Sequence, residues 1–213
     1  QMIHLPVNPS IHLSYGLHEE DAQIIGALWD QLTKLGARNR ERTRYYEMEN
    51  AVRSLGLTTP PGMRNFEAFF GWSAKAVDVM ADRINLETFK LSGYDTDLDK
   101  FGLKAILEAN PIAELSTEAT TDSLLHCCSF LIVGEGDTDN HEPKALITTK
   151  DALAGTGFWD VRRHGMSDFL SVNKVDSRGL PTDMALYQHG RTLHIRRDQD
   201  SAMWQVDEQF HDL

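Results

Sequence analysis

The residues of this chain with the clearest potential for acid and base chemistry lie near Trp159. Asp160, His164 and Asp168 combine two carboxylates with an imidazole, groups that commonly transfer protons in enzymes. On adjacent strands these side chains could support a small α+β hydrolase. The alternative is a β-rich region in which the same residues are only exposed polar side chains, and the sequence leaves both interpretations open.

Other patterns that mark enzymes are missing from the chain. Its nine histidines show no His-x-x-x-His spacing of the kind that holds zinc on a helix, and His189 and His194 straddle a predicted turn. No Gly-x-Ser-x-Gly segment places a serine nucleophile on a strained turn. Gly134-Glu135-Gly136 lacks the lysine of a phosphate-binding loop and is interpreted as a turn. We therefore expect no enzyme activity, no catalytic, metal-binding or cofactor-binding residues, and no cofactor.

An acidic segment from Asp95 to Asp99 superficially matches a calcium-binding loop. Such a loop needs glycine at its sixth position and a bidentate glutamate at its twelfth. This chain has Lys100 and Ile106 at those positions. The segment is therefore not expected to bind calcium, and Asp97 is predicted to cap the N-terminus of a helix.

Composition and charge narrow the class of protein further. The only cysteines, Cys127 and Cys128, are adjacent, so they offer neither a disulfide framework nor a spaced zinc pair and are expected to be small apolar filling. A net charge of −11 argues against binding nucleic acid through the general surface, but it is compatible with a channel through which DNA slides. No apolar run approaches the ~20 residues that cross a bilayer, and the N-terminus lacks a signal-peptide pattern, so a soluble, cytoplasmic chain is expected.

Arginines at every second position interrupt this acidic character; they are Arg38, Arg40, Arg42 and Arg44. On a helix they stack as two i,i+4 pairs of like charge, which is slightly destabilising unless acidic neighbours balance it. Glu41, Glu47 and Glu49 are placed to do so. The run is therefore either a solvated helix face with ion pairs or a contact with a neighbouring subunit or DNA.

Hydrophobic periodicity predicts helices in the first part of the chain. Ile25, Leu28, Leu32 and Leu35 recur at helical spacing within residues 19–54, a segment that a kink at Gly36 could divide. Six residues at helical spacing predict a second long helix with one buried, aromatic-rich face. They are Phe66, Phe70, Ala74, Val77, Ala81 and Ile84. A short strand at 86–91 and helices at 98–109 and 112–126 follow, with Asn110-Pro111 as the cap and first-turn proline of the last helix.

After Cys128 the pattern changes to short alternating or β-branched runs separated by turn residues. Strands are predicted at 129–133, 145–149, 169–175, 183–187, 192–196 and 204–209. Residues 176–179 and 189–190 suit hairpins, so antiparallel pairing of consecutive strands is expected. The predicted class is α+β, with an N-terminal half of long amphipathic helices, residues 1–127, and an antiparallel β-rich half, residues 128–213.

One ordered set of aromatic, charged and small residues spans nearly the whole chain. It consists of Leu28-Trp29, the arginine run ending in Tyr45-Tyr46, Leu55-Gly56, the segment Gly-Trp-Ser-Ala-Lys-Ala-Val-Asp at 71–78, Ala81-Asp82-Arg83, the segment 128–133, Trp159-Asp160 and Leu186-Tyr187. No piece is diagnostic alone, but the order and spacing together resemble the portal proteins of tailed bacteriophages of the siphovirus type.

The resemblance implies a fold and a role. Residues 1–127 would be the mainly helical part of a portal wing and residues 128–213 its antiparallel β part, with the stem, clip and crown absent from this chain. The chain would be the N-terminal fragment of a structural subunit of a phage or prophage portal. Such subunits form a ring, usually a dodecamer, at one capsid vertex, through which DNA is packaged and ejected.

The same resemblance implies the partners and the location. The partners would be other portal subunits, the large terminase subunit, capsid and scaffolding proteins, neck proteins, and double-stranded DNA that passes without sequence-specific binding. No membrane is involved. The protein would belong to the virion, at the capsid vertex, and to the host cytoplasm during assembly. No residue of such a subunit needs to react.

Overall fold

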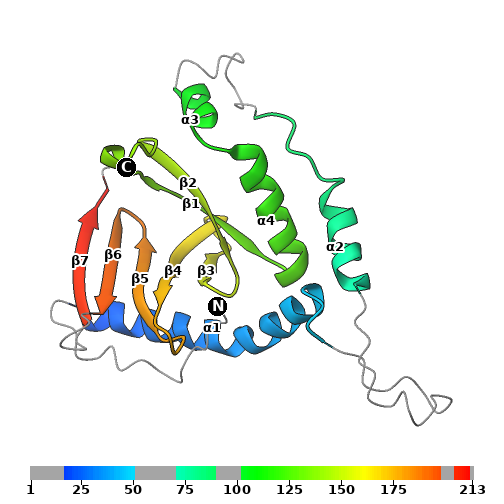
Figure 1. The fold of residues 1–213 in the computed structure, drawn as a ribbon. Coiled ribbons are helices and arrows are strands. Elements are labelled where there is room, and N and C mark those ends of the chain that lie inside the picture. The colour runs from blue at the N-terminus through cyan, green and yellow to red at the C-terminus, as the bar shows by residue number, and fades with distance from the viewer. Residues whose placement is uncertain (1–16, 51–70, 90–101, 198–203, 212–213) are drawn as a thin grey trace, which may run out of the picture. The chain divides into compact units, whose positions relative to one another are not determined.

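The computed structural model describes residues 17–50, 71–89, 102–197 and 204–211 of the chain (Figure 1). In chain order its elements are α1 (Glu19–Tyr46), α2 (Trp72–Ala81), α3 (Leu103–Ala109), α4 (Ile112–His126), β1 (Ser129–Glu135), the short 3-10 helix η4 (Thr138–Asn140), β2 (Ala145–Asp151), β3 (Gly155–Asp160), β4 (Gly165–Val175), β5 (Pro181–Gln188), β6 (Arg191–Arg197) and β7 (Trp204–Phe210). The predicted α+β class is confirmed.

The chain forms two compact units, each held together by its own contacts. Unit 1 consists of Gln1–Arg40 and Ala152–Leu213, and unit 2 of Glu41–Asp151. The long helix α1 therefore contributes most of its length to unit 1 and its last residues to unit 2.

Unit 1 contains a five-stranded antiparallel sheet in the order β3-β4-β5-β6-β7. Each strand pairs with the next one in the sequence, so the predicted consecutive pairing is confirmed, as are the hairpins at 176–179 and 189–190. Strand β3 was not predicted because its two glycines, Gly155 and Gly157, weaken the strand signal. Gly157 is needed there, since a Cβ atom at this position would lie 2.7 Å from the carbonyl oxygen of Asp168.

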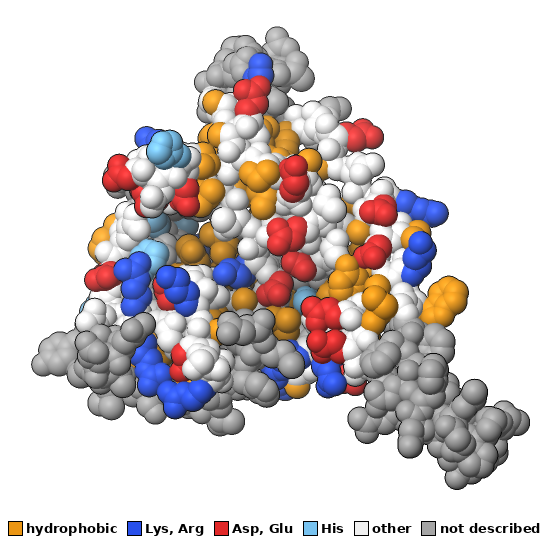
Figure 2. Space-filling model, viewed as in Figure 1, with side chains coloured by type: hydrophobic (Ala, Val, Ile, Leu, Met, Phe, Trp, Pro, Cys, Tyr) orange, Lys and Arg blue, Asp and Glu red, His pale blue; other side chains and the backbone are white. Residues whose placement is uncertain are grey.

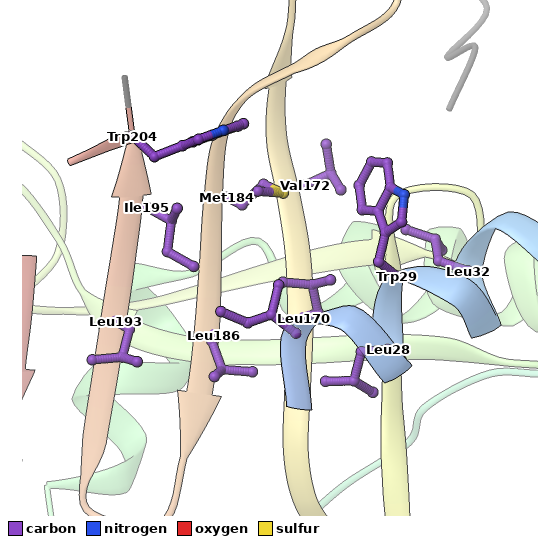
Figure 3. Packing of buried hydrophobic residues seen from close by; sticks show 11 residues of the cluster. Leu28, Trp29, Leu32, Leu170, Val172, Met184, Leu186, Leu193, Ile195 and Trp204 are labelled. Carbon is purple, nitrogen blue, oxygen red and sulfur yellow. The ribbon is translucent and has the colours of Figure 1, made fainter. Parts of the chain in front are cut away.

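The core of unit 1 lies between α1 and one face of the sheet. The strand residues of this core alternate along β4, β5 and β6, because alternate side chains point to the same face of a sheet. The cluster comprises Ile25, Leu28, Trp29 and Leu32 from α1 with Leu170, Val172, Met184, Leu186, Leu193, Ile195 and Trp204 from the sheet. Figure 3 shows Leu28, Trp29 and Leu32 beside Leu170 of β4. Full burial of such side chains contributes roughly 1.5 to 3 kcal/mol each.

Helix α1 differs from its prediction in two respects. It is continuous through the buried Gly36, so it is not divided into two helices there. It also ends at Tyr46 instead of Ser54, where Met48 adopts a left-handed backbone with φ of 60° and the N–H of Glu49 donates to the carbonyl of Arg44. Leu35, the last residue of the predicted stripe, is 36% exposed.

Polar contacts fix the position of α1 on the sheet of unit 1. The buried carboxylate of Asp21 accepts a hydrogen bond of 2.6 Å from Arg191 of β6, whose other nitrogen lies 2.9 Å from Glu208 of β7. Farther along α1, the Gln31 amide donates to the hydroxyl of Thr156 at 2.8 Å. The first turn of α1 is therefore tied to β6 and β7, and its middle is tied to β3.

Unit 2 contains a second, two-stranded antiparallel sheet, in which β1 pairs with β2 from Ser129↔Asp151 to Glu135↔Ala145. Helix α4 packs against both strands, and α2 packs against α4. The buried Asn110 side chain donates to the carbonyls of Ile106 and Ala145 and accepts from the N–H of Ile147. Asn110 therefore joins the end of α3 to β2, and Pro111 is the N-cap of α4 rather than its first-turn residue.

Several boundaries predicted for unit 2 need correction. The described part of the predicted helix at 66–84 is α2, which ends at Ala81 where the backbone tightens into i→i+3 hydrogen bonds. Ile84 lies beyond that end and is 49% exposed, so its predicted burial is wrong. Residues 86–89 form no strand, and Gly134-Glu135 belongs to β1 instead of a turn. Phe66, Phe70 and Asp97 lie outside the described residues.

Candidate functional site

The three residues of the hydrolase alternative lie on the hairpin formed by β3 and β4. Asp160 ends β3, His164 occupies the turn with a left-handed φ of 52°, and Asp168 lies in β4 opposite Phe158. The Asp160 carboxylate accepts from the N–H groups of Arg162 at 2.8 Å and of Arg163 at 3.2 Å.

These contacts show what the two carboxylates do. Asp160 holds the turn in place, and its other oxygen lies 3.8 Å from the Arg163 guanidinium. Asp168 accepts a hydrogen bond of 2.8 Å from the Gln188 amide of the neighbouring strand β5. Both acids therefore serve the hairpin and the sheet, and the structure gives the hydrolase alternative no support. Within the described ranges, no group of three or more His, Cys, Asp or Glu side chains could hold a metal ion.

The same hairpin presents apolar side chains to solvent. We call residues Trp159–Met166 the β3–β4 tip. Trp159 and Met166 are cross-strand neighbours and are 59% and 41% exposed, and Val161 is 74% exposed. Phe158 packs against the core and Trp159 is exposed, because successive strand residues point to opposite faces of the sheet. The register shift between Phe158 and Trp159 pairs Trp159 with Met166. Arg162, Arg163 and His164 are exposed in the same segment, which makes the tip both apolar and basic.

The arginine run on α1 has two kinds of contact in unit 2. The Arg44 guanidinium lies 3.7 Å from Glu49, one of the acids predicted to balance it, but both side chains are about half exposed and the pair contributes little. The Arg42 guanidinium instead reaches the Cys127 sulfur at 3.2 Å. Cys127 and Cys128 are both exposed, so their prediction as apolar filling is wrong. Cys127 ends α4 in a left-handed conformation with φ of 72°, which turns the chain out of the helix.

Next to this contact, the end of α1 meets α4 and α2. The Thr43 hydroxyl lies 3.0 Å from Nε2 of the buried His126, and the Tyr46 hydroxyl donates to Asp78 at 2.8 Å. Burial lowers the pKa of His126, helped by the nearby Arg42 and opposed by Asp151. The hydrogen bond to Asp78 raises the pKa of Tyr46. These contacts hold α1, α2 and α4 together.

Helix α4 carries a row of acids on one face, visible in Figure 2. Glu114, Glu118 and Asp122 follow one another at i, i+4 and i+8, and together with Ala113, Thr117 and Thr121 they line a shallow open hollow of about 540 Å³. Within the described ranges none of the three acids forms an ion pair with a basic side chain. Burial, followed by the charges of Asp151 and Glu118, raises the pKa of Asp122 to about 6.

The sequence alone did not single out these two surfaces. The i, i+4, i+8 spacing of the acids was readable once a helix at 112–126 was predicted. The β3–β4 tip could not be found in the same way, because β3 itself was missed. In the part of the chain that the structure describes, no helix is long and apolar enough to span a membrane.

Comparisons with known proteins give one indication of the family that this chain resembles. No family model matches the chain. The chain is 29% identical to the portal protein of Mycobacterium phage D29 over 115 residues. The similarity is to a phage portal protein. It covers 54% of this chain but only 22% of the length of that protein. It supports a portal-like family for this chain.

Proposed function

We propose that this chain is part of a structural subunit of a phage or prophage portal of the siphovirus type. The observation that carries the proposal is the similarity to the mycobacteriophage portal protein over 115 residues. In this role the subunits form a ring, usually a dodecamer, at one capsid vertex, and DNA is packaged and ejected through it. The chain corresponds to the N-terminal wing part, with a helical region at 1–127 and an antiparallel β region at 128–213.

The arrangement of the described residues supports this role. A ring subunit acts by its shape, so it needs a stable body and exposed surfaces for its neighbours. Unit 1 has a closed core between α1 and the sheet, and the β3–β4 tip exposes an aromatic ring beside two arginines. Tryptophan and arginine are residues on which protein interfaces often depend.

The proposed partners are other portal subunits, the large terminase subunit, capsid and scaffolding proteins, neck proteins and double-stranded DNA in transit. A net charge of −11 suits DNA that passes without being held, because phosphates are repelled by a surface of the same sign. The proposed location is the capsid vertex of the virion, and the host cytoplasm during assembly.

Imaging of the complete gene product tests the proposal. The protein encoded by the whole gene is purified and examined by negative-stain electron microscopy. Closed rings with a central channel support the portal function. A product that stays monomeric, or that stops at closed dimers at every concentration, contradicts it, because a twofold pair cannot form a ring.

Assays of the purified chain test the expected lack of catalysis. Phosphatase, nuclease and ATPase turnover is expected to equal that of a buffer blank, because Asp160 and Asp168 are already committed to structural contacts. Turnover that is reproducible and disappears in Asp160→Ala or His164→Ala would overturn this expectation.

A further inference from the structure

We infer that the β3–β4 tip of one copy docks on the acidic face of α4 in a second copy. The tip is defined above as residues Trp159–Met166, and the acidic face by Glu114, Glu118 and Asp122. The inference deepens the proposed function and rests on it in one respect, namely that a ring subunit meets identical neighbours.

The composition of the tip is that of an interface rather than of an ordinary turn. Three apolar side chains, Trp159, Val161 and Met166, are between 41% and 74% exposed within a segment of eight residues. Contiguous exposed apolar surface with a charged border marks contact sites in soluble proteins. Asp160 contributes the only acid in the segment, and its carboxylate is bound to the turn itself. Arg162 and Arg163 therefore give the tip a net positive charge on a chain whose overall charge is −11.

The face of α4 has the complementary properties. Its three acids crowd one side of the helix and have no basic partner among the described residues. Between them lie Ala113, Thr117 and Thr121, and the hydroxyls of both threonines are turned back to carbonyls of their own helix. The resulting hollow has a weakly polar floor bordered by carboxylates. Burial, followed by the charges of Asp151 and Glu118, raises the pKa of Asp122, and a guanidinium from a partner would favour the charged form of this carboxylate.

Charge selects the orientation of the contact. Two tips facing each other would bring arginines together, and two α4 faces would bring carboxylates together, both of which cost free energy. Only tip against α4 places opposite charges opposite each other. Such a contact joins unlike surfaces head to tail, and head-to-tail contacts generate rings or open chains instead of closed dimers.

Photo-crosslinking tests which surface the tip meets. The photoreactive residue p-benzoylphenylalanine replaces Trp159, and equal amounts of nitrogen-15-labelled and unlabelled chain are mixed and irradiated over a rising concentration series. Mixed-isotope peptides that join position 159 to residues 113–122 are the expected result. A link within one chain, a link to another surface, or no link up to the solubility limit would each overturn the inference.

Charge reversal tests the role of the arginines and acids. Arg162→Glu with Arg163→Glu, and separately Glu118→Arg with Asp122→Arg, are each expected to weaken self-association about tenfold or more. A 1:1 mixture of the two variants is expected to restore association, with the two variants alternating. The acidic tip of the first variant meets the basic α4 face of the second, and the unchanged tip meets the unchanged face, whereas each variant alone pairs like charges. The chain carrying all four changes restores association. Lys104→Glu and Glu108→Lys on α3 are matched controls that leave association unchanged.

The outcomes separate this inference from the proposed function. If the complete gene product forms rings but the four-change chain is not restored, the inference fails and the portal function stands. If crosslinks map to α4 and the restored pair associates, but the complete product forms no ring, the contact is real and the portal function fails. Circular dichroism of each variant confirms that lost association does not reflect lost folding.

Discussion

The two units of this protein are stabilised in different ways. Unit 1 buries a continuous apolar cluster of eleven side chains between α1 and five antiparallel strands. In the described part of unit 2, Ala81 is the only buried hydrophobic residue, and the other buried side chains are the polar Asn110 and His126. The hairpin β1–β2 instead exposes Leu131 and Val133 by 59% and 68%.

This difference assigns stability mainly to unit 1 and open surface mainly to unit 2. Unit 1 has a core that is sufficient to hold its sheet in place. The described part of unit 2 depends more on single hydrogen bonds, such as those of Asn110 and Thr43, and keeps apolar and acidic surfaces open. Both properties fit the role in assembly proposed above, because surfaces that meet a partner cannot also be buried within the subunit.

The largest expected effect comes from the core of unit 1. Leu170→Ala removes a fully buried side chain at the centre of the cluster, and we expect the free energy of unfolding of unit 1 to fall by about 2 to 5 kcal/mol. Urea denaturation monitored by tryptophan fluorescence measures the loss. Leu131→Ala, the same change at an exposed site of unit 2, should cost less than about 1 kcal/mol. Equal losses at the two sites would contradict the contrast between the units.

The next effect concerns the polar anchor of α1. Asp21→Ala removes a carboxylate that is almost completely buried against Arg191, and the expected loss is about 3 kcal/mol because the guanidinium loses a close partner inside the structure. The loss should shrink in Asp21→Asn, whose amide oxygen can still accept from Arg191. Asp183→Ala is the control, since its partner Arg196 lies 3.9 Å away and is 61% exposed, and a pair of this kind contributes about 0.5 kcal/mol. Differential scanning calorimetry of the three variants measures their melting temperatures. Equal decreases for Asp21→Ala and Asp183→Ala would contradict the proposed importance of the Asp21–Arg191 contact.

Much of the fold was predictable from local patterns. The α4 boundaries, the consecutive antiparallel pairing and the hairpin at His189-Gly190 all follow from periodicity and turn residues, which depend on neighbours in the sequence. Strand β3 was missed because its glycines carry no alternating side chains. The predicted end of α1 was too late. The residue that adopts the left-handed backbone after the helix is Met48, whereas glycine or asparagine is the usual sequence signal for such an end.

The surfaces were harder to predict than the elements. Periodicity shows which face of a helix is polar, but it does not show that Arg42 reaches Cys127 or that Asn110 joins α3 to β2, because those contacts link residues far apart in the sequence. The trio Asp160, His164 and Asp168 was close in sequence and suggested chemistry. In the structure two of its members hold a turn and a strand, which only the partners of their carboxylates could reveal.

A smaller loss of stability is expected in unit 2, where the hydrogen bonds of the Asn110 side chain join α3 to β2. Asn110→Ala removes two donated hydrogen bonds and one accepted from the N–H of Ile147, and we expect a loss of about 2 kcal/mol in the stability of unit 2. Hydrogen exchange of the Ile147 amide measures the effect directly, because this amide loses its acceptor. Asn140→Ala, at an exposed site, should change exchange little. Unchanged protection of Ile147 in Asn110→Ala would show that unit 2 does not depend on this contact.

The smallest effect is a gain in stability with a defined pH dependence. The pKa of Asp122 is raised to about 6 in the folded protein, from an ordinary value of 3.8, because of burial and the neighbouring acids Asp151 and Glu118. Between those two values the folded state binds more protons than the unfolded state, so the contribution of this group to stability is greatest at low pH and is lost as the pH rises through about 6. Asp122→Asn removes the charge, and we expect it to stabilise the protein by about 1 kcal/mol at neutral pH, a value reduced because the side chain is partly exposed.

The lowered pKa of His126 has the opposite pH dependence, but it is present in both proteins and cancels in their difference to a first approximation. Urea unfolding at several pH values should therefore show a gain that vanishes below about pH 4. A gain that is independent of pH would show that the crowding of charge on α4 is not its cause.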